Sequence, residues 1–76
     1  MTLKQQQANV SVRRFDYDDR TVIAADFGPA ADPSIDLLDE VAIVVYGDGQ
    51  QTEIDLPPGE VQAFNRNGVV TFEVRK

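Results

Sequence analysis

Residues 61–76, VQAFNRNGVVTFEVRK, contain the clearest structural signal in the chain. Asn67-Gly68 separates two segments, and this dipeptide readily supplies the positive φ angles of a two-residue hairpin turn. From Val70 onward the sequence alternates between apolar and polar residues, which is typical of a strand with one buried face. The ending therefore predicts an antiparallel hairpin. In its second strand the inward residues are Val70, Phe72 and Val74, and the outward residues are Thr71, Glu73 and Arg75.

Five further strand-like segments precede this hairpin, and turn residues bound each of them. They cover residues 10–17, 20–27, 35–37, 41–46 and 52–56. Residues 22–25 are apolar on both faces, which predicts a well-buried strand. No window shows helical periodicity. Seven short strands with regularly spaced turns predict an all-β, antiparallel, immunoglobulin-like β-sandwich over residues 10–76, preceded by a flexible polar tail at residues 1–9.

The composition argues against an enzyme. A chain of 76 residues forms one domain at most, with a thin core and little room for an enclosed active site. It contains no cysteine and no histidine, so a thiolate metal site and a nucleophile paired with a His base are excluded. No apolar run is long enough to span a membrane, and the first residues lack a signal-peptide core. We expect a cytoplasmic protein without catalytic residues.

Two short segments resemble ligand-binding loops but lack features that such loops require. Asp16, Asp18 and Asp19 suggest a calcium loop, but the required Gly and closing Glu are missing at the proper spacing. Gly47 and Gly49 flank Asp48 without leading into a helix, so they do not form a phosphate loop. The sequence predicts no metal ion and no cofactor.

The charge balance restricts the possible partners. Thirteen acidic residues face seven basic ones, giving a net charge of −6, and nine of the acids are Asp while only two of the bases are Lys. Such a surface repels the phosphate backbone, so we expect no nucleic-acid partner. Two interpretations of the excess acid remain open. One is ordinary solubility from net charge, and the other is adaptation to high salt, in which case the protein should lose stability in dilute buffer.

The segment AFNRNGVV carries a resemblance to a known family. Its pattern of Ala, three residues, Asn-Gly, Val and an aliphatic residue resembles the end of the alpha-crystallin domain of small heat-shock proteins. The matching residues are Ala63, Asn67, Gly68, Val69 and Val70. Three earlier segments resemble the family in the same order, namely AADFGP around Asp26, IDLLDEVAIVVYG at 35–47 and IDLPPG at 54–59. The resemblance covers residues 10–76.

The departures from this family pattern bear on assembly. Phe64 stands three residues before Asn67, where the family has its aromatic residue two before, so Phe64 is expected to point outward or to sit beside a bulge. Residues 47–52 leave room only for a turn in place of a strand-exchange loop. The family's hydrophobic N-terminal arm and its Ile-x-Ile tail are not present in the sequence. The resemblance therefore implies a minimal alpha-crystallin domain, either a monomer or a weak edge dimer.

The resemblance implies a protein-binding function. It suggests an ATP-independent holdase of the stress response that binds unfolding client proteins. A binding groove is implied between the strand with Ile35 and Leu37 and the strand with Val61 and Ala63. The same fold occurs in CS-domain co-chaperones, so an adaptor for one folded partner is an alternative, and a structural accessory subunit is a third.

Alternation in the middle of the chain predicts a second binding surface. If Ile35, Leu37, Ile43 and Val45 face the core, their neighbours Leu38, Val44 and Tyr46 point outward. Together with Phe64 they are predicted to form an exposed apolar patch that binds a partner. The alternative is a local slip in register, with Leu37 or Leu38 in the turn.

Overall fold

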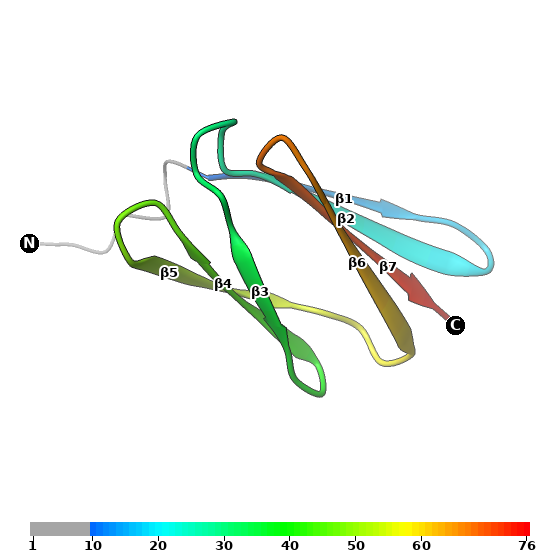
Figure 1. Cartoon of the computed structure of the whole chain (residues 1–76). Coiled ribbons are helices and arrows are strands. Elements are labelled where there is room, and N and C mark those ends of the chain that lie inside the picture. Colours follow the sequence, from blue (N-terminus) through cyan, green and yellow to red (C-terminus); the bar gives the residue numbers. More distant parts are fainter. Residues whose placement is uncertain (1–9) are drawn as a thin grey trace, which may run out of the picture.

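Residues 10–76 are the part of the chain that the structure describes, and in this computed structural model they form seven β-strands and no helix (Figure 1). The strands are β1 (Ser11–Asp16), β2 (Arg20–Asp26), β3 (Ser34–Leu37), β4 (Val41–Tyr46), β5 (Gln50–Asp55), β6 (Glu60–Arg66) and β7 (Val69–Arg75). All seven lie within the predicted domain. The predicted tail, residues 1–9, lies outside the described residues.

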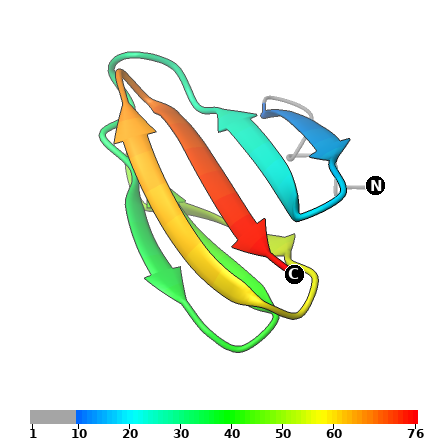
Figure 2. The same cartoon turned by 90° about the vertical axis from the view of Figure 1, so that its right-hand side faces the viewer.

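The strands form two antiparallel sheets that pack face to face. The four-stranded sheet has the order β1-β2-β7-β6, and the three-stranded sheet has the order β3-β4-β5. Figure 1 shows the two layers from the side, and Figure 2 shows the four-stranded layer in front of the other. The predicted all-β sandwich of seven antiparallel strands is thus confirmed. Among the described residues β1, β3, β5 and β6 are edge strands, so one side of each backbone has no strand partner there.

The Asn67-Gly68 turn connects β6 to β7 as predicted. The φ angles of these residues are 53° and 83°, both in the left-handed region. The side-chain oxygen of Asn65 accepts a hydrogen bond from the backbone N–H of Gly68 at 3.3 Å. The carbonyl oxygen of Gly68 accepts another from the backbone N–H of Phe27 at 2.8 Å. The turn therefore reverses the chain and also holds the β6–β7 hairpin against the end of β2.

The hydrophobic core lies between the two sheets. Phe72 is its largest fully buried side chain and stands on β7, a central strand of the four-stranded sheet. The predicted inward face of β7 is confirmed, because Val70 and Val74 are also buried. The remaining buried apolar residues are Ile23, Ala25, Ala42, Val44, Ile54 and Leu56.

The prediction for β4 is wrong about which face is buried. Val44 is fully buried and Ala42 lies beside it in the core, whereas the alternation predicts that Val44 points outward. Ile43 is only half-buried and Val45 is 39% exposed, although both were expected in the core. Every residue from Val41 to Tyr46 is apolar or aromatic, so the segment itself does not reveal its inward face.

The turn before β4 explains this reversal. The backbone N–H of Leu38 donates a hydrogen bond to the carbonyl oxygen of Val41, which closes a two-residue turn. This turn pairs Ile35 with Val44 across the β3–β4 ladder. Residues paired directly across a ladder point to the same face of the sheet. Because Ile35 faces the core, Val44 must face it too.

Burial of β2 is confirmed for one face only. Ile23 and Ala25 are buried between the sheets, whereas Val22 and Ala24 point to the other face and are half-buried. No layer from residues 10–76 covers that face of the four-stranded sheet. The apolar residues there are shielded only by neighbouring side chains.

Candidate functional site

The predicted groove residues lie on the inner faces of two edge strands. Both views place β3 and β6 on the same flank of the sandwich, one at the edge of each sheet (Figures 1 and 2). Ile35 on β3 and Val61 and Ala63 on β6 are half-buried and pack against the core. Leu37 ends β3 and is 41% exposed. The four side chains therefore bring an apolar surface to the flank where two sheet edges are open.

A hollow of about 330 Å³ marks one end of this flank. It brings the turn after β3 together with the start of β6, because its lining comes from both. The turn supplies the carboxylates of Asp39 and Glu40. Gly59 belongs to this lining and has a φ angle of 143°, and a Cβ atom there would overlap the carbonyl oxygen of Arg75. The full lining is Leu38, Asp39, Glu40, Pro57, Pro58, Gly59 and Val61.

The predicted patch of Leu38, Val44, Tyr46 and Phe64 does not exist as one surface. Val44 is in the core for the reason given above. Tyr46 shares its face and packs against Phe27, with ring centroids 4.7 Å apart and ring planes tilted by 46°. Leu38 and Phe64 are exposed, but Leu38 lies in the turn after β3 and Phe64 lies on β6 of the four-stranded sheet. The expectation that Phe64 points outward is confirmed, since its side chain is 52% exposed.

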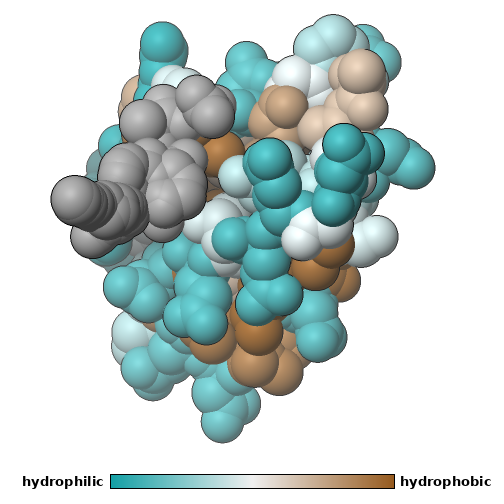
Figure 3. Space-filling model, turned by 90° about the vertical axis from the view of Figure 1, so that its left-hand side faces the viewer, coloured by the Kyte–Doolittle hydropathy of each residue, from teal (hydrophilic) through white to brown (hydrophobic). Residues whose placement is uncertain are grey.

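A different apolar stripe runs along the outer face of β4. Val41, Ile43 and Val45 share this face, and acidic residues of β3 and β5 flank them. Asp36 and Glu53 pair with Ile43 from the two sides. Figure 3 shows the molecule from the side of the three-stranded sheet, where brown apolar atoms interrupt a mostly teal surface. Counting the two-residue turn at 39–40 would have revealed this stripe from sequence.

The family-like motif residues hold turns and packing in place. Ala63 and Val70 point inward, and Val69 points to the outer face. The Asp26 side chain accepts a hydrogen bond from the backbone N–H of Gly28 at 3.0 Å, just after β2. Gly28 in turn lies against Gly68. These contacts therefore hold the hairpin in position.

Charges are segregated between the two halves of the sandwich. Residues 27–59, which include the whole three-stranded sheet, contain seven acidic residues and no basic one, whereas six of the seven basic residues occur at positions 13–20 and 66–76. At one end of the four-stranded sheet Arg20 Nε lies 3.2 Å from a Glu73 oxygen. The N–H is not aimed along that line, so the contact is an ion pair rather than a hydrogen bond. The three-stranded sheet is thus the acidic side.

Asp16 at the end of β1 has a perturbed acidity. The hydroxyl of Thr21 donates a hydrogen bond to its carboxylate at 2.9 Å, and Arg14 Nε lies 3.2 Å from the same oxygen. The Thr21 hydrogen bond, with a smaller contribution from Arg14, lowers the pKa of Asp16 below its ordinary value of 3.8. Thr21 itself is buried, so this bond satisfies the one buried polar side chain of residues 10–76.

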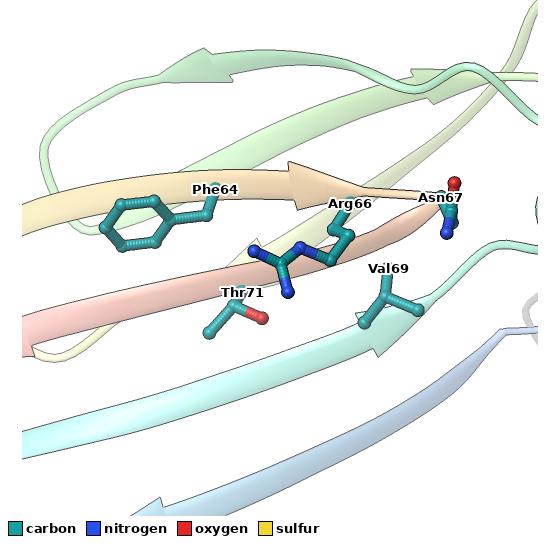
Figure 4. Close-up of a pocket in the computed structure, with 5 residues that line it drawn as sticks. All are labelled: Phe64, Arg66, Asn67, Val69 and Thr71. Carbon is teal, nitrogen blue, oxygen red and sulfur yellow. The ribbon is translucent and has the colours of Figure 1, made fainter.

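The outer face of the four-stranded sheet contains a hollow that sequence reasoning missed. Its volume is about 540 Å³, and its lining is Phe64, Arg66, Asn67, Val69 and Thr71 (Figure 4). The guanidinium of Arg66 extends from β6 toward Phe64 and Thr71. The hollow therefore combines an aromatic ring, small apolar surfaces and a cation.

A cluster of metal-binding side chains and a membrane-spanning helix are both absent from residues 10–76. Within residues 10–76 no three acidic side chains gather closely enough to hold a metal ion. The same part of the chain has no helix long and apolar enough to cross a membrane. What the surface does offer is apolar edges and faces with charged rims.

Comparison with known proteins identifies a family without assigning an activity. Residues 1–74 match the model of DUF7127, a family of unknown function, and the chain belongs to this family. Searches of curated proteins and of solved structures each returned no significant match.

Proposed function

We propose that this protein is an ATP-independent chaperone of the holdase type, which binds exposed apolar segments of unfolding proteins in the groove between β3 and β6. The observation that carries the proposal is the pair of open sheet edges on one flank. Between these edges lie the half-buried side chains of Ile35, Val61 and Ala63 and the exposed side chain of Leu37. The resemblance to the alpha-crystallin domain supports the same site.

The physical basis is strand addition. An unfolding client exposes extended segments, and such a segment can hydrogen-bond to the free backbone edge of β3 or β6. Every second client side chain then points into the groove, where it contacts Leu37 and Val61. Carboxylates at the mouth, from Asp39 and Glu40, keep the occupied surface charged. The net charge of −6 opposes aggregation of the complex.

A cytoplasmic role during stress, in a cell with high internal salt, fits this proposal. The acidic surface is then the adaptation that keeps the chain soluble, and the chaperone works where salt screens its self-repulsion. Assays therefore belong in high salt.

A second candidate is an adaptor that binds one folded partner. The stripe of Val41, Ile43 and Val45 on the outer face of β4 favours it. This stripe is a narrow apolar surface with carboxylates on both sides, which suits a fixed partner better than varied clients. Binding of a partner to this stripe would not involve the β3–β6 groove.

The test is light scattering of a heat-aggregating client in high salt with the full chain. We expect suppression at about equimolar ratio, loss of suppression in Leu37→Asp and retention in Val45→Asp. The two positions make a matched pair, because they are 41% and 39% exposed and lie on opposite faces of the three-stranded sheet. Circular dichroism confirms that each variant is folded.

The outcomes separate the two candidates. A folded native protein that does not suppress scattering removes the holdase function and leaves the adaptor. Suppression that is lost in Val45→Asp and kept in Leu37→Asp would move the site from the groove to the outer stripe of β4.

A further inference from the structure

The outer face of the four-stranded sheet carries a continuous row of side chains. Cross-strand pairing aligns Arg13 on β1 with Ala24 on β2, then Thr71 on β7 and Phe64 on β6. Paired residues point to the same face of a sheet. The residues next to them along the strands, such as Ile23 and Phe72, point to the other face and are buried. The row therefore crosses the whole outer face from one edge strand to the other.

The row is low in the middle and high at its ends. Ala24 and Thr71 are small, whereas Arg13 and Phe64 are long. Two hollows result, one of about 540 Å³ beside Phe64 and Arg66 and one of about 270 Å³ beside Arg13. Val69 lines both, so they adjoin. Together they form one shallow trough, in which the small side chains of Ala24, Val69 and Thr71 lie beside polar ones.

Both ends of the trough carry an unused positive charge. Neither Arg13 nor Arg66 forms an ion pair with any residue between 10 and 76. One carboxylate lines the trough, that of Asp26, and one of its oxygens already accepts a hydrogen bond from Gly28. This face therefore carries unpaired positive charge, although the chain as a whole has a net charge of −6. Guanidinium groups in such a position favour carboxylate or phosphate ligands.

We propose that this trough binds a short extended segment of a partner protein in which two carboxylates flank an apolar side chain. Arg66 and Arg13 lie on strands three spacings apart and are offset by two residues along the strands, which puts their backbones roughly 16 Å apart. An extended peptide covers most of this distance in about four residues, and the long arginine side chains reach across the rest. A segment with acids at positions one and five and an aromatic residue at position three places all three side chains on one side. The aromatic ring then rests beside Phe64, above Thr71 and Val69.

Charge and area favour this ligand over two others. A nucleic acid would face the repulsion of thirteen acidic residues, with few arginines to displace its counterions. A second copy could offer its own row of Asp36, Ile43 and Glu53. However, the outer sheet face measures roughly 400 Å², about half of the ~800 Å² per partner that a stable interface buries. A short segment fits both the charge and the size.

The experiment is a titration of the ¹⁵N-labelled full chain with a designed peptide, followed by backbone amide shifts at the lowest salt that keeps the protein folded. The probe is acetyl-Ser-Asp-Ser-Phe-Ser-Asp-Ser-amide. We expect saturable shifts at Phe64, Arg66, Val69 and Thr71. Replacing both Asp of the peptide by Asn, or its Phe by Ser, should weaken binding about tenfold or more. These peptide controls leave the protein unaltered.

Variants of the protein test the site itself. Arg66→Glu should weaken binding at least tenfold, and Arg13→Glu should weaken it as well. Arg75→Glu is the matched control, because it makes the same change in net charge on the same face, six residues away along β7 from Val69. We expect its affinity to stay within twofold of the native value.

Several results would overturn the proposal. They are the absence of shifts, equal loss of binding in Arg75→Glu and Arg66→Glu, or shifts confined to Ile35, Leu37 and Val61. An oligothymidylate that binds more tightly than the peptide and depends on Arg66 would replace the proposed ligand by nucleic acid. Outer-face shifts that appear with protein concentration alone would replace it by a second copy. None of these results bears on client suppression through the groove, which is measured separately.

Discussion

Replacing Gly68 by alanine should show how strongly the β6–β7 turn holds the sandwich together. Two independent effects oppose a side chain at this position. Its φ angle of 83° lies in the left-handed region, which costs an L-residue about 1–2 kcal/mol. The new Cβ atom would also overlap the carbonyl oxygen of Gly28, so the loop after β2 must move.

A second glycine separates these two effects. Gly49 has a φ angle of 90° and nothing within 4 Å of its would-be Cβ atom. Gly49→Ala therefore measures the backbone cost alone. Gly68→Ala adds the displacement of packed backbone, for which overpacking data suggest about 1–3 kcal/mol. The expected total for Gly68→Ala is about 2–5 kcal/mol, against about 4–11 kcal/mol for the whole domain.

The assay is urea unfolding of both variants and the native protein at one salt concentration, with a thermal scan as a check. Each kcal/mol should lower Tm by about 4–8 °C in a domain of this size. Gly68→Ala should also weaken the hydrogen bond between Phe27 and Gly68, so the amide of Phe27 should exchange faster with solvent. Equal stability of the two variants would refute the claim that the approach of Gly68 to Gly28 matters.

Two further predictions concern the burial of Val44 and the pH dependence of stability that arises from Asp16. Val44→Ala should destabilise the fold by about 1.5–3 kcal/mol because Val44 is fully buried, and Val45→Ala by less than about 0.5 kcal/mol, as urea unfolding can measure. A larger loss of stability in Val45→Ala than in Val44→Ala would show that Val45 faces the core, as alternation alone predicts. For Asp16, a folded-state pKa below 3.8 means that its stabilising contribution is present above the unfolded pKa and is lost as pH falls through the folded pKa. The stability gap between native protein and Thr21→Val should therefore stay constant well above pH 3.8 and shrink as the pH falls through 3.8 and below it. A stability gap that does not change with pH would show that the Thr21 hydrogen bond does not lower the pKa of Asp16.

The sequence sufficed for the fold where local chemistry and pattern agreed. The Asn67-Gly68 turn demands positive φ angles, and the strand alternates from Val70 onward, so both its existence and its inward face were predictable. The β4 segment was different, because Val44 and Val45 are chemically identical neighbours. Only the length of the preceding turn decides between them, through the pairing of Ile35 with Val44.

Of the two candidate sites, the groove was expected from the sequence and the trough was not. The groove residues Ile35 and Val61 came from resemblance, and their half-buried position at two open edges is compatible with it. The trough needed the structure. Arg13 and Phe64 are 51 positions apart, and they share a row only because β2 and β7 lie between their strands. No motif in either segment encodes that sheet order.

Strand β6 connects the two proposals. Its alternate residues serve different sides, with Val61 and Ala63 facing the groove and Phe64 and Arg66 facing the trough. A segment that pairs with the free edge of β6 must present its own residues alternately to the same two sides. Apolar residues then meet the groove, and acidic residues lie beside Arg66. On these grounds a segment in which acidic and apolar residues alternate should bind more tightly than a uniformly apolar one, and the acidic residues would select among clients.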